Sequence, residues 1–205
     1  MSNIGFFGGT FNPPHLAHKR LALQMKEEAD LDKILVVPTF VPPHKAVLSL
    51  ASGEDRLEMC RLLFDDEFFS VSDIELQRRG KSYSFDTLTE LKKRYPDDKL
   101  FMIVGSDMLL SFHEWYRYRD ILKLVTLCAA SRDGKEGVKK LCEYAMNTLG
   151  LDADKGEIII SVLPPVELSS TEIRALLADR KNAEEYLGKD VSDYIKKRGL
   201  YHELH

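Results

Sequence analysis

The sequence has little excess charge of either sign, and it lacks any long apolar run. Its 205 residues carry a formal net charge of −4, so no overall positive field attracts the chain to nucleic acid or to an anionic membrane. No stretch approaches the roughly 18–20 consecutive apolar residues that a membrane-spanning helix needs. The N-terminus also lacks the basic start and apolar core of a secretion signal. These absences predict a cytoplasmic protein that binds neither nucleic acid nor membrane.

Cysteine is scarce, and its positions do not have the spacing of a metal site. Cys60, Cys128 and Cys142 each lie among apolar residues. This context predicts reduced thiols in or near the core, and neither disulfides nor metal ligands.

The composition is that of a folded globular protein, with 44% hydrophobic and 30% charged residues. The chain is long enough for one well-filled domain and short for two. We predict a single domain over 1–205, in which the part from about 165 to 205 is a small helical extension.

Short apolar runs rich in Val, Ile or Phe alternate with longer stretches that have helical spacing. The runs lie at 4–7, 34–37, 68–74, 100–104, 124–130 and 158–162. Continuous apolarity suits strands buried on both faces, and strand–helix alternation indicates parallel strands with right-handed crossovers. The sequence therefore predicts an α/β, Rossmann-like, doubly wound and mainly parallel sheet with helices on both faces. Segments 38–53 and 75–83 are expected to be loops, and ligands are expected beyond the carboxyl ends of the strands.

Residues 8–18 follow the first predicted strand and open the first predicted helix. They read Gly8-Gly9-Thr10-Phe11-Asn12-Pro13-Pro14-His15-Leu16-Ala17-His18. The glycines permit a sharp turn close to a ligand, and the unpaired amides of a helix start attract phosphate. On a first helical turn, His15 and His18 share a face and can stabilise charge on a transferred phosphoryl group. A metal site on these two histidines is the alternative, but no third ligand stands at a suitable spacing.

A late segment, Ser169-Ser170-Thr171-Glu172-Ile173-Arg174, also has the pattern of a helix start. Ser169 and Glu172 fit a reciprocal capping box. Arg174 is expected in the first turn, where the helix dipole disfavours a cation unless an anion binds nearby. The hydroxyls and the multi-donor guanidinium therefore predict a second phosphate site, and a simple helix cap is the alternative.

With these two segments the sequence resembles the nucleotidyltransferase superfamily. The superfamily signatures are a Gly-Thr-Phe-Asp-Pro stretch ending in His-x-Gly-His and a later Ser-Ser-Thr-x-x-Arg. Asn12 stands in place of the usual Asp and Ala17 in place of the usual Gly, while both histidines are kept. The resemblance assigns the α-phosphate of ATP to the histidines and the β- and γ-phosphates to the late segment. The expected ATP-binding residues are Gly8, Gly9, Thr10, Phe11, His15, His18, Gly105, Asp107, Ser169, Ser170, Thr171 and Arg174.

Asp107 follows the fourth predicted strand in Gly105-Ser106-Asp107. Its carboxylate could accept hydrogen bonds from a ribose or help to organise a metal ion, and helix capping is the alternative. Ser84 or Asp86 is a candidate cap for the helix after the 75–83 loop.

Further segments resemble the bacterial nicotinate-nucleotide adenylyltransferase family in order and spacing. They are Pro42-Pro43-His44-Lys45, Ser82-Tyr83-Ser84-Phe85-Asp86-Thr87-Leu88, Gly105-Ser106-Asp107 and Phe112-His113-Glu114-Trp115. The resemblance implies that Trp115 stacks on a pyridine ring, and that Ser84 and the Tyr116 amide hold its carboxylate. It also implies that Lys45 orients the acceptor phosphate and that Arg132 occupies a basic position of the family. Asn12 completes the expected acceptor-binding set.

The expected reaction joins the AMP part of ATP to nicotinic acid mononucleotide and releases pyrophosphate, in NAD biosynthesis. The expected catalytic residues are His15, His18, Lys45 and Arg174, with Mg²⁺ held mainly by the substrate phosphates. One alternative is a related adenylyltransferase that uses nicotinamide mononucleotide or another phosphorylated acceptor. Another is a nucleotide-binding regulator without catalysis. The sequence leaves open whether the protein forms a homo-oligomer.

Overall fold

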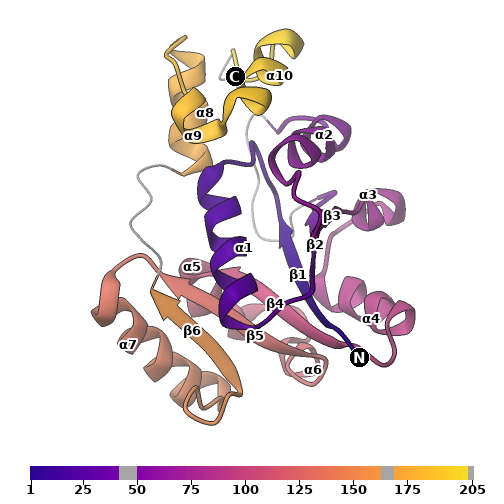
Figure 1. The fold of residues 1–205 in the computed structure, drawn as a ribbon, viewed down its shortest axis with the longest axis vertical. Coiled ribbons are helices and arrows are strands. Elements are labelled where there is room, and N and C mark those ends of the chain that lie inside the picture. Colours follow the sequence, from indigo (N-terminus) through magenta and orange to yellow (C-terminus); the bar gives the residue numbers. More distant parts are fainter. Residues whose placement is uncertain (42–49, 163–168, 203–205) are drawn as a thin grey trace. The chain divides into compact units, whose positions relative to one another are not determined.

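The computed structural model describes residues 1–41, 50–162 and 169–202 (Figure 1). Within these residues one six-stranded sheet has the order β3-β2-β1-β4-β5-β6. The strands are β1 (Asn3–Gly9), β2 (Lys33–Pro38), β3 (Phe69–Val71), β4 (Lys99–Gly105), β5 (Val125–Ser131) and β6 (Ile158–Val162). Pairing is parallel from β1 to β4, from β4 to β5 and from β5 to β6. The predicted α/β fold is thereby confirmed.

Helices connect the strands and form the C-terminal part. They are α1 (Leu16–Glu28), α2 (Gly53–Leu63), α3 (Ile74–Arg78), α4 (Ser84–Arg94), α5 (Ser106–Leu110), α6 (Tyr118–Ile121), α7 (Gly134–Tyr144), α8 (Ser170–Ala178), α9 (Glu184–Leu187) and α10 (Lys189–Arg198). A 3-10 turn, η1 (Phe112–Glu114), and a π-helical turn, η2 (Ala145–Leu149), extend α5 and α7. None of the helices among the described residues has the length and apolarity needed to cross a membrane.

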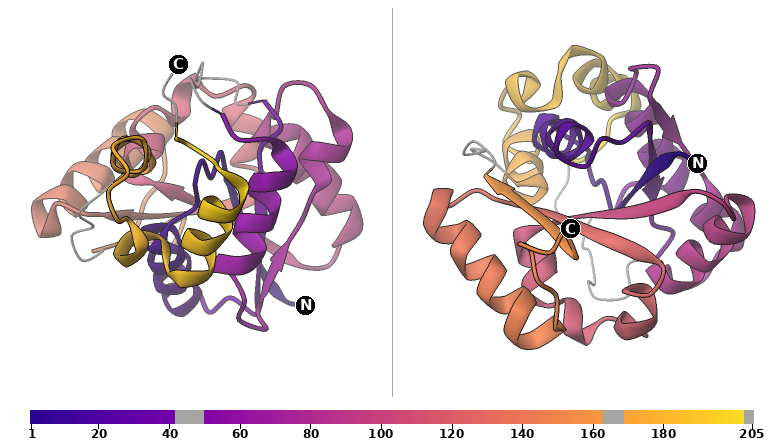
Figure 2. Two further views of the ribbon diagram at one scale, coloured as in Figure 1. Left: turned by 90° about the horizontal axis from the view of Figure 1, so that it is seen from above. Right: turned by 60° about the horizontal axis from the view of Figure 1, so that its bottom comes forward.

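The sheet changes winding direction between β1 and β4. From β1 the chain continues to β2 and β3 on one side, and from β4 it continues to β5 and β6 on the other. Because parallel crossovers are right-handed, the two directions put α1 and α7 on opposite faces, as Figure 2 shows. Ligands of such sheets bind at this reversal, outside the carboxyl ends of the strands. The turn after β1 and the turn after β4 are therefore the places to look for a site.

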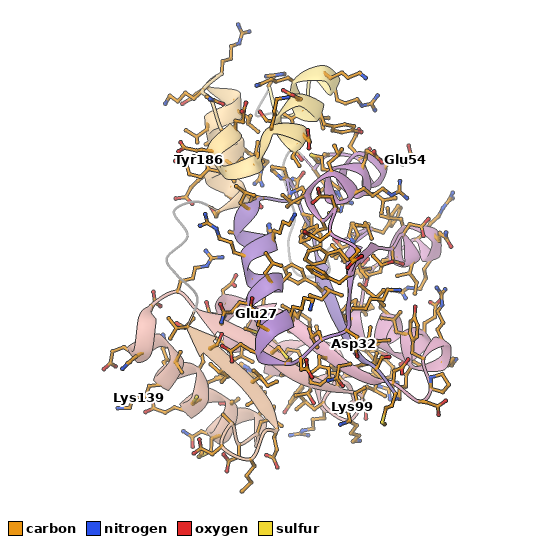
Figure 3. The ribbon with its side chains drawn as sticks, viewed as in Figure 1. Glu27, Asp32, Glu54, Lys99, Lys139 and Tyr186 are labelled. Atoms are coloured by element: carbon orange, nitrogen blue, oxygen red, sulfur yellow. The ribbon has the colours of Figure 1, made fainter. Side chains whose placement is uncertain are left out.

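The chain divides into two compact units. Unit 1 comprises Met1–Gly8, Leu21–Leu35 and Tyr83–Val166, and unit 2 comprises Gly9–Arg20, Val36–Ser82 and Glu167–His205. In unit 1, Leu100 to Val104 of β4 are all buried, because the strand is covered on both faces. In unit 2, α10 packs against α2. Charged side chains such as Lys139 on α7 and Glu54 on α2 are exposed on the outer faces of their helices (Figure 3).

Two local expectations were wrong. The apolar run at 68–74 forms a strand only at β3, and Ile74 begins α3, so the segment after it is not all loop. Periodicity does not separate a short strand from a short helix in an apolar run of this length. Neither Ser84 nor Asp86 caps α4, because Tyr83 is the N-cap and makes no side-chain capping bond. The helical character expected for the C-terminal part is confirmed, and α10 ends at Gly199, whose backbone is left-handed with φ of 64°.

Candidate active site

A buried phenylalanine lies in the turn that follows β1, and Gly9 is the last residue of that strand. A Cβ on Gly9 would lie only 3.0 Å from the ring of Phe11, so glycine allows this ring to pack closely against the strand end. Phe11 has a left-handed backbone, with φ of 48°, and is 2% exposed. Its ring packs edge-on against the rings of His18 and Phe64, at centroid distances of 5.1 and 6.0 Å. The buried ring therefore fixes the backbone that leads to the histidine pair.

The two predicted histidines lie together at the start of α1. His15 directly precedes the helix and His18 is within its first turn, and their ring centroids are 3.8 Å apart. The backbone N–H of His15 donates to Nδ1 of His18 at 3.2 Å. A neutral imidazole that accepts at Nδ1 carries its proton on Nε2, so His18 presents an N–H donor on its other side. Such a donor suits the oxygen of a phosphate group.

The late serine-rich segment begins α8 as predicted. Ser169 is the N-cap, and it forms the full capping box with Glu172. Arg174 is the fifth residue of α8, one position past the first turn, so the expectation of a first-turn position was wrong. Its Nη2 donates to Thr171 Oγ1 at 3.3 Å, and burial lowers the pKa of the guanidinium. The arginine remains a cation at neutral pH despite this shift.

The histidine loop and α8 contact each other directly within unit 2. Ser170 Oγ donates to the carbonyl oxygen of Pro13 at 3.0 Å. Arg174 Nη1 donates to the carbonyl oxygen of Asn12 at 2.7 Å. Two segments from opposite ends of the chain are thus joined by two hydrogen bonds, directly beside His15.

Asn12 forms hydrogen bonds with three other segments of unit 2. It is 3% exposed, and its Oδ1 accepts hydrogen bonds from the Ala51 backbone N–H at 3.0 Å and from the Tyr201 hydroxyl at 2.7 Å. The sequence placed Asn12 among the acceptor-binding residues. In the structure its side-chain oxygen holds protein segments together.

Arg56, on α2, forms a hydrogen bond to the loop that leads to His15. The residue was not predicted from the sequence to have this role. It is 1% exposed, and its guanidinium donates to the carbonyl oxygens of Thr10 at 2.9 Å, Ala51 at 3.0 Å and Phe40 at 3.5 Å. Burial lowers its pKa, and no carboxylate among the described residues forms an ion pair with it. A buried cation therefore contacts the backbone of the loop that leads to His15.

The predicted pyridine-binding residues lie in unit 1, where aromatic rings bring two of their segments together. The rings of Tyr83 and Phe85, on either side of Ser84, lie 4.7 and 6.3 Å from the ring of Tyr116. Tyr116 is 51% exposed, so about half of the residue's surface is open to solvent. Trp115 is half-buried, and its ring lies 5.0 Å from that of Phe112.

Two more predicted residues follow the ends of unit 1 strands. Asp107 is exposed in the first turn of α5, and a Cβ on Gly105 would come within 2.8 Å of its carboxylate. Glycine at this position therefore permits the carboxylate to lie against the end of β4. Arg132 is exposed directly after β5.

A family model and similar proteins of known sequence both indicate the family to which this chain belongs. The family model for cytidylyltransferase-like proteins matches residues 6–176. The "Probable nicotinate-nucleotide adenylyltransferase" of Listeria innocua is 37% identical over 199 residues, which cover 97% of this chain and 96% of that protein. The protein of the same name from Shouchella clausii is 38% identical over 204 residues, covering 98% of this chain and 97% of its own.

This chain belongs to the nicotinate-nucleotide adenylyltransferase family.

Solved structures share the fold of this family member. The nicotinic acid mononucleotide adenylyltransferase of Plasmodium falciparum, complexed with NaAD, superposes with a TM-score of 0.72 at 18% identity, and 98% of each chain is covered. The same protein complexed with APC gives a TM-score of 0.71 at the same identity and coverage. At this identity the likeness concerns the fold.

Lys45, the remaining predicted catalytic residue, lies outside the described residues. The part of the chain that the structure describes also contains no group of three or more His, Cys, Asp or Glu side chains placed to hold a metal ion. All three cysteines are free, and Cys60 and Cys128 are buried, as predicted from their apolar contexts. Burial raises the pKa of Cys128 to about 12, so this thiol stays protonated.

Proposed function

We propose that this chain transfers the adenylyl group of ATP to nicotinic acid mononucleotide, giving nicotinic acid adenine dinucleotide and pyrophosphate. Membership of the family supports the reaction class and the acceptor. The observation that carries the proposal is the pair of hydrogen bonds that join the histidine loop to α8, Ser170 to Pro13 and Arg174 to Asn12. This junction places a histidine pair, a helix N-terminus and a guanidinium in one part of unit 2, as a triphosphate requires.

In the proposed reaction, a phosphate oxygen of the mononucleotide attacks the α-phosphorus of ATP in line with the departing pyrophosphate. One P–O bond forms to the acceptor, and the bond from the α-phosphorus to the bridging oxygen of the β-phosphate breaks. The nucleophile is already an anion, so no strong general base is needed. Catalysis comes from alignment and from stabilising charge on the transferred group and the leaving group.

His18 has the clearest role in this scheme. Its Nδ1 accepts from the backbone, so its Nε2–H donates to an α-phosphate oxygen and gains strength as negative charge develops. His15 lies beside it and supports the same phosphate. Arg174 has further N–H donors beyond its two protein bonds, and these steady the pyrophosphate. Lys45 orients the acceptor phosphate.

The acceptor base is proposed to bind in unit 1. Trp115 offers a flat aromatic surface to the pyridine ring, and the Ser84 hydroxyl and the Tyr116 amide hold the carboxylate. Tyr83 and Phe85 pack on the Tyr116 ring and so keep Ser84 close to it. Arg132 adds positive charge after β5, and Asp107 accepts hydrogen bonds from a ribose.

ATP is proposed to enter as its magnesium complex. We expect Mg²⁺ to be bound mainly through the substrate phosphates and water. Free thiols at all three cysteines fit a reducing compartment, and we place the protein in the cytoplasm.

The test is pyrophosphate release by the purified chain with Mg²⁺ and ATP, in the presence of either nicotinic acid mononucleotide or its amide. We expect rapid release with the acid, slower release with the amide and none without an acceptor. Release with the amide alone would reassign the acceptor. ATP binding without release with either acceptor would contradict the proposed reaction.

A further inference from the structure

The segment that follows α10 contacts the loop before α1 through the side chain of Tyr201. The Tyr201 hydroxyl donates to Asn12 Oδ1 at 2.7 Å, between residues 189 positions apart. The bond lies entirely within unit 2 and is buried. It is shorter than the bond that the Ala51 backbone N–H donates to the same oxygen, which is 3.0 Å long.

The backbone at the end of α10 has an unusual conformation at the residues that lead to the buried Tyr201 side chain. Gly199 and Tyr201 both have left-handed backbones, with φ of 64° and 66°. This region is common for glycine and rare for an aromatic residue, and such outliers gather where a side chain must be held in place. Tyr201 is 7% exposed, and burial raises the pKa of its phenol, so the hydroxyl stays a donor at neutral pH.

Asn12 is also the residue through which α8 holds the loop. Its carbonyl oxygen accepts from Arg174, and the next carbonyl, on Pro13, accepts from Ser170. Asn12 is thus bonded to Tyr201 through its side chain and to Arg174 through its backbone carbonyl oxygen, two residues before Pro14 and three before His15.

We propose that Tyr201 is a positioning residue for adenylyl transfer, acting through Asn12 on the histidine loop and on Arg174. This inference rests on the proposed function. It assigns to the segment that follows α10 a part in ATP binding.

Tyr194, a second tyrosine near the C-terminal end of the described residues, provides a matched control for Tyr201. Tyr194, on α10, donates its hydroxyl to Asp55 Oδ1 at 2.9 Å, and Arg198 Nε donates to the same oxygen at 3.0 Å. These bonds fasten α10 to α2, which lie side by side in Figure 1, without touching residues 8–15. Tyr194→Phe and Tyr201→Phe each remove one hydroxyl from the attachment of the tail, but only the second removes a bond to the loop.

The experiment measures pyrophosphate release and thermal unfolding for the full chain, Tyr194→Phe and Tyr201→Phe. We expect Tyr201→Phe to lower kcat/KM for ATP by about fivefold to tenfold, the scale of one buried hydrogen bond, through a raised KM for ATP. The KM for the mononucleotide should stay within about twofold, as should all constants of Tyr194→Phe. Equal kinetics for the two variants would overturn the inference. An inactive unmodified chain would instead refute the proposed function.

A double-mutant cycle tests whether the effect passes through Asn12. Asn12→Ala removes the same bond from the other side, and it should raise the KM for ATP at least as much even if Tyr201→Phe proved too unstable to measure. In the Asn12→Ala background, Tyr201→Phe should cause no further loss. Losses that simply add, or a normal KM for ATP in Asn12→Ala, would contradict the proposed route.

Discussion

The guanidinium of Arg174 donates a 2.7 Å hydrogen bond to the backbone carbonyl oxygen of Asn12, across 162 positions of the sequence. A cation in α8 is thereby fixed against the loop that leads to the histidine pair. The same guanidinium also contacts Thr171 Oγ1 at 3.3 Å, so its plane is set by two acceptors. Lysine, with a single ammonium group, cannot reproduce this fork.

Arg174→Lys is expected to lower kcat/KM for ATP by roughly tenfold to a hundredfold, the scale of one hydrogen bond from a charged group. Steady-state pyrophosphate release at varied ATP measures the effect. Arg180→Lys is the control, because Arg180 is exposed just beyond α8. Equal rates for the two variants would remove Arg174 from the phosphate site.

His18→Ala is expected to lower kcat by about 10²–10⁴-fold, because it removes a donor that acts as charge develops. His18→Gln keeps an N–H near the position of Nε2 and should retain more activity than His18→Asn, whose amide ends near Nδ1. Near-normal turnover in His18→Ala would exclude the residue from the mechanism. A reversed order of Gln and Asn would contradict the assigned tautomer.

Ser84→Ala is expected to reduce the preference for the acid over the amide mononucleotide, because the hydroxyl that binds the carboxylate is lost. Comparing kcat/KM for both acceptors measures this preference. Ser84→Thr keeps the hydroxyl and should preserve it. An unchanged ratio in Ser84→Ala would disprove the assigned contact.

Arg56→Met is expected to lower the free energy of unfolding by about 2–5 kcal/mol, since the carbonyls of Thr10 and Ala51 would lose buried donors. Urea unfolding followed by circular dichroism measures it. Arg61→Met, on the same helix but with a side chain that is 54% exposed, should change stability by no more than about 0.5 kcal/mol. Similar losses in both variants would argue against a special role for the buried guanidinium.

The sequence predicted those features that local chemistry encodes. Continuous apolar runs marked β4 and β6 within a residue or two, and the Ser169–Glu172 spacing predicted the capping box that the structure contains. Local sequence patterns gave wrong predictions where the same residues suited two different local structures. The run at 68–74 became a short strand and a helix, and Ser84 entered α4 without capping it.

The supporting residues of the loop could not be predicted, because their partners are distant in sequence. Tyr201 is one more aromatic residue in a helical tail until Asn12 is placed beside it. Arg56 did leave a signal, since it shares the buried stripe of α2 with Cys60 and Leu63 at helical spacing. A charged residue on an apolar stripe indicates burial, but the carbonyl oxygens that receive its hydrogen bonds come from other segments.

The three segments of unit 2 are far apart in the sequence, so the ribosome synthesises them at different times. The ribosome makes the loop with Asn12 long before it makes Tyr201, which bonds to that loop from 189 positions further along the chain. When the six strands have been synthesised, Tyr201 has not, and the hydrogen bond from Tyr201 to Asn12 cannot yet form. A stop codon shortly before Tyr201 would leave the six strands of the described residues and α10 but remove the bond to Asn12, and we expect such a truncated protein to bind ATP more weakly.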